Sequence, residues 1–149
     1  MSKWKLKTLI PTLTLVITTS VAWASDGFDP DAAWNLLGTA TVRENADWMA
    51  DKEFPDELRA ATSGFTVEGY VVPILAEPEM TAFILVQDPE NCPFCGTGSG
   101  YGPVLEVMLD RAIPSVEEFS WIKVTGELEL IEDPETFQLF RLNEARAVN

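Results

Sequence analysis

A two-residue alternation of apolar and other side chains runs through much of the chain beyond residue 64. Every second residue is Phe, Val or Gly in 65–71, and every second residue is Ile, Val, Gly or Leu in 122–130. This period is typical of β-strands with one buried face. Both runs have a central glycine, Gly69 and Gly126. Glycine weakens a strand interior unless the strand bends there, as it must where a sheet curls into a small barrel.

The rest of the pattern supports a barrel with few helices. Apolar runs bounded by turn residues predict three further strands, and Pro114 to Phe119 is expected to be a loop or a helical turn. We therefore predict a mainly β fold, a small five-stranded OB-like antiparallel barrel with short N-terminal helices. A small β-sandwich is the alternative. The three further strands are expected at Thr81 to Gln87, Val104 to Leu109 and Phe137 to Val148.

The first 24 residues have the composition of a secretory signal peptide. Three lysines lie within the first seven residues, an apolar stretch runs from Leu9 to Val21, and Ala22-Trp23-Ala24 resembles a cleavage site. An uncleaved anchor is the alternative, but a spanning helix needs about 20 apolar residues. We expect cleavage after Ala24, a periplasmic location and no stable membrane anchor. The predicted organisation is 1–24 signal peptide, 25–63 N-terminal helical or irregular segment, and 64–149 OB-like β-barrel domain.

Within residues 25–63, the clearest signal is a short helix. Asp29-Pro30-Asp31 supplies an N-cap, a first-turn proline and a first-turn acid, which predicts a helix over Pro30 to Leu37. Thr39 to Phe54 has weaker periodicity, and a second helical turn is expected from Phe54 onward. Tryptophans in such a segment usually pack against a core, and we expect Trp34 and Trp48 to do so.

The charge of the chain excludes several classes of partner. The net charge is −14, and removal of the three leader lysines leaves seven basic and 24 acidic side chains, which gives −17. Such a field repels nucleic acid and anionic membrane surfaces and attracts cations and basic partners. The alternative is that acidity simply keeps an exported protein soluble. The chain has no histidine, so it cannot contain a Ser-His-Asp or Cys-His arrangement. We predict no catalytic residues and no enzymatic function.

The two cysteines, Cys92 and Cys95, are the strongest candidate site. Their spacing fits a thiol–disulfide oxidoreductase, the one enzymatic interpretation considered, but such a pair normally begins a helix. Residues 96–103 have glycine at every second position and end in proline, which disfavours a helix. In an oxidising compartment the pair could instead form a disulfide that fixes a recognition loop. Closing so short a loop contributes about 2 kcal/mol before strain is subtracted.

Metal binding is the other interpretation of the cysteine pair. Cys92-Pro93-Phe94-Cys95-Gly96 begins like one knuckle of a zinc ribbon, and two sulfurs would also suit copper(I). Structural zinc needs four ligands, and the chain has no further cysteine or histidine. The missing ligands could come from Asp88 and Glu90, or from the same knuckle of a second subunit in a homodimer.

Several motifs in the same order resemble an uncharacterised bacterial exported family, domain of unknown function 3299. They are residues 64–74, Phe83 to Val86, the cysteine loop at 92–95, and Val124 to Leu128. The resemblance covers about Phe54 to Val148 and implies an OB-like barrel in the periplasm and a role in metal handling. The sequence thus predicts a small binding or accessory protein linked to zinc or copper. Its expected partner is an exported metal-transport or envelope protein, and a structural adaptor with a disulfide-stapled loop is the alternative.

Overall fold

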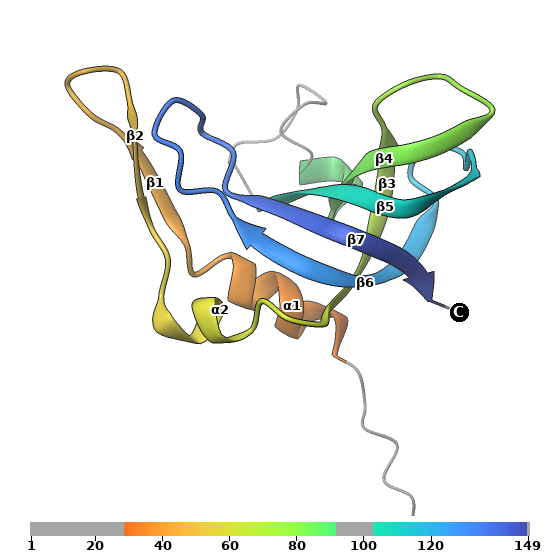
Figure 1. The fold of residues 1–149 in the computed structure, drawn as a ribbon, viewed down its shortest axis with the longest axis horizontal. Helices are drawn as coiled ribbons and strands as arrows, with labels where there is room; N and C mark the ends of the chain where they lie inside the picture. The colour runs from red at the N-terminus through yellow and green to blue at the C-terminus, as the bar shows by residue number, and fades with distance from the viewer. Residues whose placement is uncertain (1–28, 92–102, 149) are drawn as a thin grey trace, which may run out of the picture.

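A closed five-stranded β-barrel forms the centre of the structure (Figure 1). The computed structural model describes residues 29–91 and 103–148. Within them the barrel order is β3-β4-β5-β7-β6, with β6 paired to β3. In chain order the elements are α1 (Pro30–Leu37), β1 (Thr41–Glu44), β2 (Ala50–Glu53), α2 (Asp56–Ala60), β3 (Phe65–Pro73), β4 (Glu79–Val86), the 3-10 helix η1 (Pro89–Asn91), β5 (Val104–Pro114), β6 (Trp121–Leu130) and β7 (Phe140–Val148).

The strand order confirms the OB-like barrel and corrects one part of the prediction. If the barrel strands are numbered from one to five along the chain, the order is 1-2-3-5-4, with the fourth strand closing on the first. Four of the five neighbouring pairs are antiparallel, but β5 and β7 run parallel. An odd number of strands cannot alternate in direction around a closed ring, so at least one pair has to be parallel. The expectation of a wholly antiparallel barrel was therefore wrong at this seam.

The alternation in the sequence corresponds to the inside and outside of the barrel. In β3, Phe65, Val67, Gly69 and Val71 are buried, while the residues between them are partly exposed. The same core includes side chains from α1, α2 and the segment between β2 and α2, so the N-terminal residues share the barrel's core. The core side chains are Trp34, Leu37, Phe54, Leu58, Phe65, Val67, Val71, Met80, Phe83, Leu85, Leu105, Val107, Val124, Leu128, Phe140, Leu142 and Ala145.

Both strand glycines lie where another part of the barrel comes very close. A Cβ on Gly69 would lie 2.6 Å from the carbonyl oxygen of Val86, and one on Gly126 would lie 2.6 Å from that of Asn143. Real side chains do not tolerate such distances to backbone atoms. Gly126 also lies at the irregularity in the β6–β7 register between Thr125 and Glu127. The glycines therefore allow the tight closure of the sheet that their positions predicted.

Three strand ends differ from the sequence prediction by two residues or more, and the first is the start of β4 at Glu79 rather than Thr81. β5 continues to Pro114, five residues beyond the expected end at Leu109, because its last part pairs with β4 through Met80↔Ile113 and Glu79↔Pro114. Residues 110–112 are Asp, Arg and Ala, whose pattern does not predict a strand. β7 begins at Phe140 rather than Phe137, since residues 131–139 form the connection from β6.

The N-terminal helix is confirmed, with the predicted bounds. Asp29 Oδ1 accepts a hydrogen bond from the Asp31 amide at 3.0 Å, which satisfies one of the free amides of the first turn. Trp34 is buried against the barrel, and its Nε1 donates to the carbonyl oxygen of Glu68 at 2.7 Å. In Figure 1, α1 and α2 lie along the lower side of the barrel. This packing confirms the expected place of Trp34 in the core.

Residues 39–54 contain an element that the sequence did not predict. β1 and β2 form an antiparallel hairpin with the register Thr41↔Glu53 to Glu44↔Ala50, where a helical or irregular segment was expected. Both strands are mostly polar and exposed, so they have little of the alternation that identifies a half-buried strand. The hairpin is held by its turn and by hydrogen bonds to a distant loop, which local sequence patterns do not reveal.

A polar cluster ties β7 to β5 along the parallel seam. Arg141 Nε donates to Glu106 Oε2 at 2.6 Å, and Gln138 Nε2 donates to the same oxygen at 2.7 Å. Burial acts to raise the pKa of Glu106, but these two hydrogen bonds and the Arg141 charge outweigh it and hold the pKa below its ordinary value. The seam therefore has side-chain bonds in addition to its parallel backbone pairing.

The predicted signal peptide, residues 1–24, and its cleavage site after Ala24 lie outside the described residues. In the described part of the chain, no helix has the length and apolar character needed to cross a membrane. Export to the periplasm stays a prediction from the sequence.

Candidate functional site

The cysteine pair cannot be placed, because Cys92 and Cys95 lie outside the described residues. The connection that carries them leaves β4 after Val86 and enters β5 at Val104, and these two residues are direct cross-strand partners. Of the two proposed carboxylate ligands, Asp88 accepts the Glu90 amide at 2.9 Å through Oδ1, and Glu90 is exposed. Between residues 29 and 91 and between 103 and 148, no group of three Cys, Asp or Glu side chains is arranged to hold a metal ion.

An apolar row crosses the outer face of the barrel at the base of this connection. Tyr70 lies opposite Trp121 on one side and opposite Val86 on the other, and Val86 lies opposite Val104. The rings of Tyr70 and Trp121 pack edge to face with centroids 4.7 Å apart, and Trp121 remains 51% exposed. Val86 itself is buried, so the aromatic end of this row is the part that faces solvent.

The tip of the β1–β2 hairpin presents Trp48 to solvent. This side chain is 78% exposed, more than any other large apolar side chain in the described residues. Its backbone φ is 62°, in the left-handed region, which costs a non-glycine residue roughly 1 kcal/mol or more. The expectation that Trp48 packs against the core was therefore wrong.

The hairpin tip is organised by one asparagine. Asn45 Oδ1 accepts hydrogen bonds from the backbone amides of Asp47 and Met49, both at 3.0 Å. Its Nδ2 donates to Asp51 Oδ1 at 3.2 Å, and its backbone exchanges hydrogen bonds with Met49 and Trp48. An asparagine that caps its own turn in this way fixes the backbone of the following residues. Trp48 is consequently held on a defined turn.

The hairpin is fastened to the connection between β6 and β7, beside which it lies in Figure 1. Lys52 Nζ donates to the carbonyl oxygens of Ile131, Asp133 and Gln138 at 2.8, 2.8 and 2.7 Å. The Ala50 amide donates to the Pro134 carbonyl oxygen at 2.8 Å. Burial lowers the pKa of Lys52, and the Asp133 carboxylate acts in the opposite direction. The position of the tip relative to the barrel is thereby set.

We call Trp48, the turn at 45–49 and the connection at 131–139 the hairpin surface. The connection contributes a second exposed aromatic side chain, Phe137, which is 47% exposed. Acidic residues predominate around it, and the nearby Arg43 and Arg59 are in ion pairs with Glu53 and Glu132. The acidic residues of the hairpin and connection are Glu44, Asp47, Asp51, Glu53, Glu132, Asp133 and Glu135. The surface therefore combines exposed aromatic groups with negative charge.

Sequence reasoning missed this surface, although one signal was available. Asn45-Ala46-Asp47 has the composition of a turn, and polar residues of strand-compatible length flank it on both sides. The exposure of Trp48 depends on the hairpin standing away from the barrel, and the hairpin is held there by the carbonyl oxygens at 131–138 that accept from Lys52.

No protein-family model, curated protein or solved structure matches this chain.

Proposed function

We propose that the protein is a small exported binding module that recognises a protein of the cell envelope through the hairpin surface. The observation that supports this most strongly is Trp48, an almost fully exposed indole at a left-handed backbone position. Tryptophan is enriched among the few residues that dominate the energy of protein–protein contacts. The exposed indole adds little to the stability of the free protein and its backbone adds strain, and burial against a partner would offset that strain.

The charge of the hairpin surface narrows the class of partner. Its excess of carboxylates, added to the net charge of −14 for the chain, favours a partner with basic residues around an apolar pocket. Opposite charges would accelerate association and orient the partner, while the indole would supply most of the affinity. A metal-transport protein or another envelope protein with such a surface is the proposed partner. OB-like barrels are widely used for binding, but that fold-level analogy is not a functional argument in itself.

A photo-crosslinking experiment in cells tests this proposal. A photoreactive amino acid is placed at Asp47, whose side chain is exposed, in a wild-type and in a Trp48→Gly background. We expect a discrete crosslinked partner in the first background and its loss in the second. Purified Trp48→Gly is expected to stay within about 1 kcal/mol of wild type in free energy of unfolding, because relief of the left-handed strain offsets the greater freedom of glycine in the unfolded chain. Loss of the crosslink would then have no explanation in misfolding.

The control position is Glu117, an exposed residue in the β5–β6 connection, away from the hairpin in sequence. A crosslink of equal strength from Glu117 would mean nonspecific proximity, and an unchanged crosslink in the Trp48→Gly background would mean that the indole is not recognised. Either result would contradict the proposed role of the hairpin surface. Fluorescence of Trp48 does not serve as a readout, because the chain has five tryptophans.

The second candidate function is binding of zinc or copper by Cys92 and Cys95. The observation that favours it is the knuckle-like order Cys92-Pro93-Phe94-Cys95-Gly96, together with the resemblance to domain of unknown function 3299, membership of which we also propose. The exposed Trp121 of β6 lies in the same cross-strand row as Val86 and Val104, so a metal-stabilised loop and an aromatic contact could act on one partner.

Native mass spectrometry of the mature protein distinguishes the states of the cysteine pair. Stoichiometric metal on the reduced protein, lost in a Cys92→Ser/Cys95→Ser double variant, is the result expected for a metal site. Metal found only on a dimer would indicate that two subunits share the ion. A mass lower by about two hydrogens without metal would instead indicate a disulfide and the adaptor function.

A further inference from the structure

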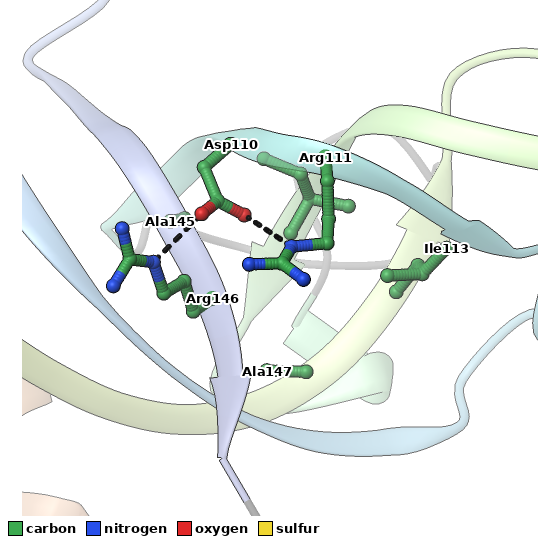
Figure 2. Close-up of a pocket in the computed structure, with 7 residues that line it drawn as sticks. Asp110, Arg111, Ile113, Ala145, Arg146 and Ala147 are labelled. Atoms are coloured by element: carbon green, nitrogen blue, oxygen red, sulfur yellow. Dashed lines mark hydrogen bonds and ion pairs between the residues drawn. The ribbon is translucent and has the colours of Figure 1, made fainter.

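A cavity of about 250 Å³ opens where β5 and β7 separate. The last parallel pair between these strands is Leu109↔Ala145. Beyond it, β5 continues along β4 and β7 continues along β6, so the seam widens. The residues around the opening are Leu109, Asp110, Arg111, Ile113, Ala145, Arg146 and Ala147 (Figure 2).

Two arginines share one carboxylate at the rim of this cavity. Arg146 Nε donates to Asp110 Oδ2 at 2.7 Å, and Arg111 Nε lies 3.5 Å from Asp110 Oδ1. Both the hydrogen bond and the ion pair involve the Nε atom, and in the described part of the chain neither guanidinium has another partner for its terminal Nη groups. The arginine side chains are 78% and 66% exposed for Arg111 and Arg146, whereas that of Asp110 is 18% exposed. The Asp110 carboxylate therefore lies between the two guanidiniums, as Figure 2 shows, and both arginine side chains remain open to solvent.

This rim is unusual in so acidic a chain. The described residues include seven basic side chains, and the other five are engaged elsewhere: Arg43, Arg59, Lys123 and Arg141 in ion pairs, and Lys52 with three carbonyl oxygens. At the cavity, two positive charges face one negative charge. The Arg146 hydrogen bond is the main reason that the pKa of Asp110 is below its ordinary value, so the carboxylate is ionised and the rim carries one net positive charge.

Apart from the three charged residues of the rim, the residues that line the cavity are apolar. Ala145 and Ala147 alternate with Arg146 along β7, so they point to the opposite side of the strand. Ala145 is buried, and Leu109 and Ile113 pack against the barrel core. The opening thus has a charged rim and an apolar interior, which matches a ligand with one anionic end and a short hydrocarbon body.

We propose that this cavity binds a small aliphatic monocarboxylate. Its carboxylate would accept hydrogen bonds from the terminal Nη groups of Arg111 and Arg146, whose planar geometry suits a carboxylate, and its hydrocarbon part would contact Leu109, Ile113 and Ala147. The single negative charge of such a ligand would neutralise the one net positive charge of the rim. A phosphate dianion has more negative charge than the rim has positive charge, and it would leave the apolar walls uncovered. This site is separate from the hairpin surface and does not depend on the function proposed for it.

Calorimetric titration of the whole mature protein with sodium hexanoate tests the site. The decisive variant is Asp110→Asn, which removes the negative charge that Asp110 places beside the ligand's carboxylate. We expect hexanoate to bind about tenfold more tightly to this variant, and about tenfold more weakly to Arg146→Gln. If Asp110 served only to bridge the strands, its replacement would loosen the cavity and weaken binding.

Two matched ligands and two further variants complete the test. Hexanamide, which has the same body without the charge, is expected not to bind, and inorganic phosphate is expected to compete poorly. Ala147→Phe should block hexanoate by filling the opening, and Arg43→Gln should leave binding unchanged because Arg43 lies on the β1–β2 hairpin. No binding of hexanoate to wild type or Asp110→Asn, or equal competition by phosphate, would overturn the proposal.

Discussion

Replacing Gly69 with alanine is expected to lower the free energy of unfolding by about 3 kcal/mol, at the upper end of the range for overpacked cores. The added Cβ would lie 2.6 Å from the backbone oxygen of Val86, which is held in the β4 ladder and cannot rotate away. It would also lie 3.0 Å from side-chain atoms of Leu85 and Trp34. Relief would require β3 and β4 to separate and α1 to shift at the same time.

The matched control for this substitution is Gly64→Ala. Gly64 has a φ of 61°, but a Cβ there would meet nothing within 4 Å. Its replacement should cost about 1 kcal/mol through backbone strain alone. Urea unfolding of the two variants separates the effects, and similar losses would mean that closure of the barrel at Gly69 is not tight. Retained stability in Gly69→Ala would contradict the geometry of the β3–β4 pair.

Replacing Lys52 with methionine is expected to release the β1–β2 hairpin from the barrel. The ammonium group donates to three carbonyl oxygens, and hydrogen bonds to charged groups contribute about 1.5–3 kcal/mol each, less where water can replace the donor. We expect a local loss of about 2–3 kcal/mol. Hydrogen exchange should show it as faster exchange of the Ala50 amide, which donates to Pro134 across the same contact.

The control for Lys52 is Arg43→Met on the same hairpin. Arg43 forms a 3.8 Å ion pair with Glu53, and both side chains are about three-quarters exposed. Such pairs contribute from zero to about 1 kcal/mol, so exchange in the hairpin should change little. Equal effects of the two substitutions would show that charge on the hairpin matters and that the carbonyl contacts do not. Unchanged exchange at Ala50 in Lys52→Met would contradict the fastening role.

The predictable parts of the fold are those in which burial repeats with a fixed period. The alternation at 65–71 and 122–130 identified β3 and β6 and their inner faces, because one side of each strand faces the core. The caps of α1 fixed its bounds for a similarly local reason. Gly69 and Gly126 indicated that the sheet closes into a barrel, because glycine weakens the interior of a strand unless the strand has to bend there.

The features that escaped prediction are held by partners distant in sequence. The hairpin depends on Lys52 reaching residues about 80 positions later, and the end of β5 depends on pairing with Glu79 and Met80. Asp110, Arg111 and Arg146 come together only because β7 is inserted beside β5. The candidate site predicted from sequence, Cys92 and Cys95, lies outside the described residues, so the hairpin surface and the cavity were both found from the structure.

The position of β7 in the sheet also determines when the barrel can close during synthesis of the chain. It is the final strand of the described chain, but it lies between β5 and β6, both of which precede it. While the ribosome has still to make residues 140–148, β5 and β6 each present an unpaired edge, and Phe140 and Leu142 are missing from the core. A nascent chain therefore remains open until its last strand emerges. If the chain is exported, as residues 1–24 predict, delayed closure of this kind would favour passage of the unfolded polypeptide through a narrow translocation channel before the barrel forms.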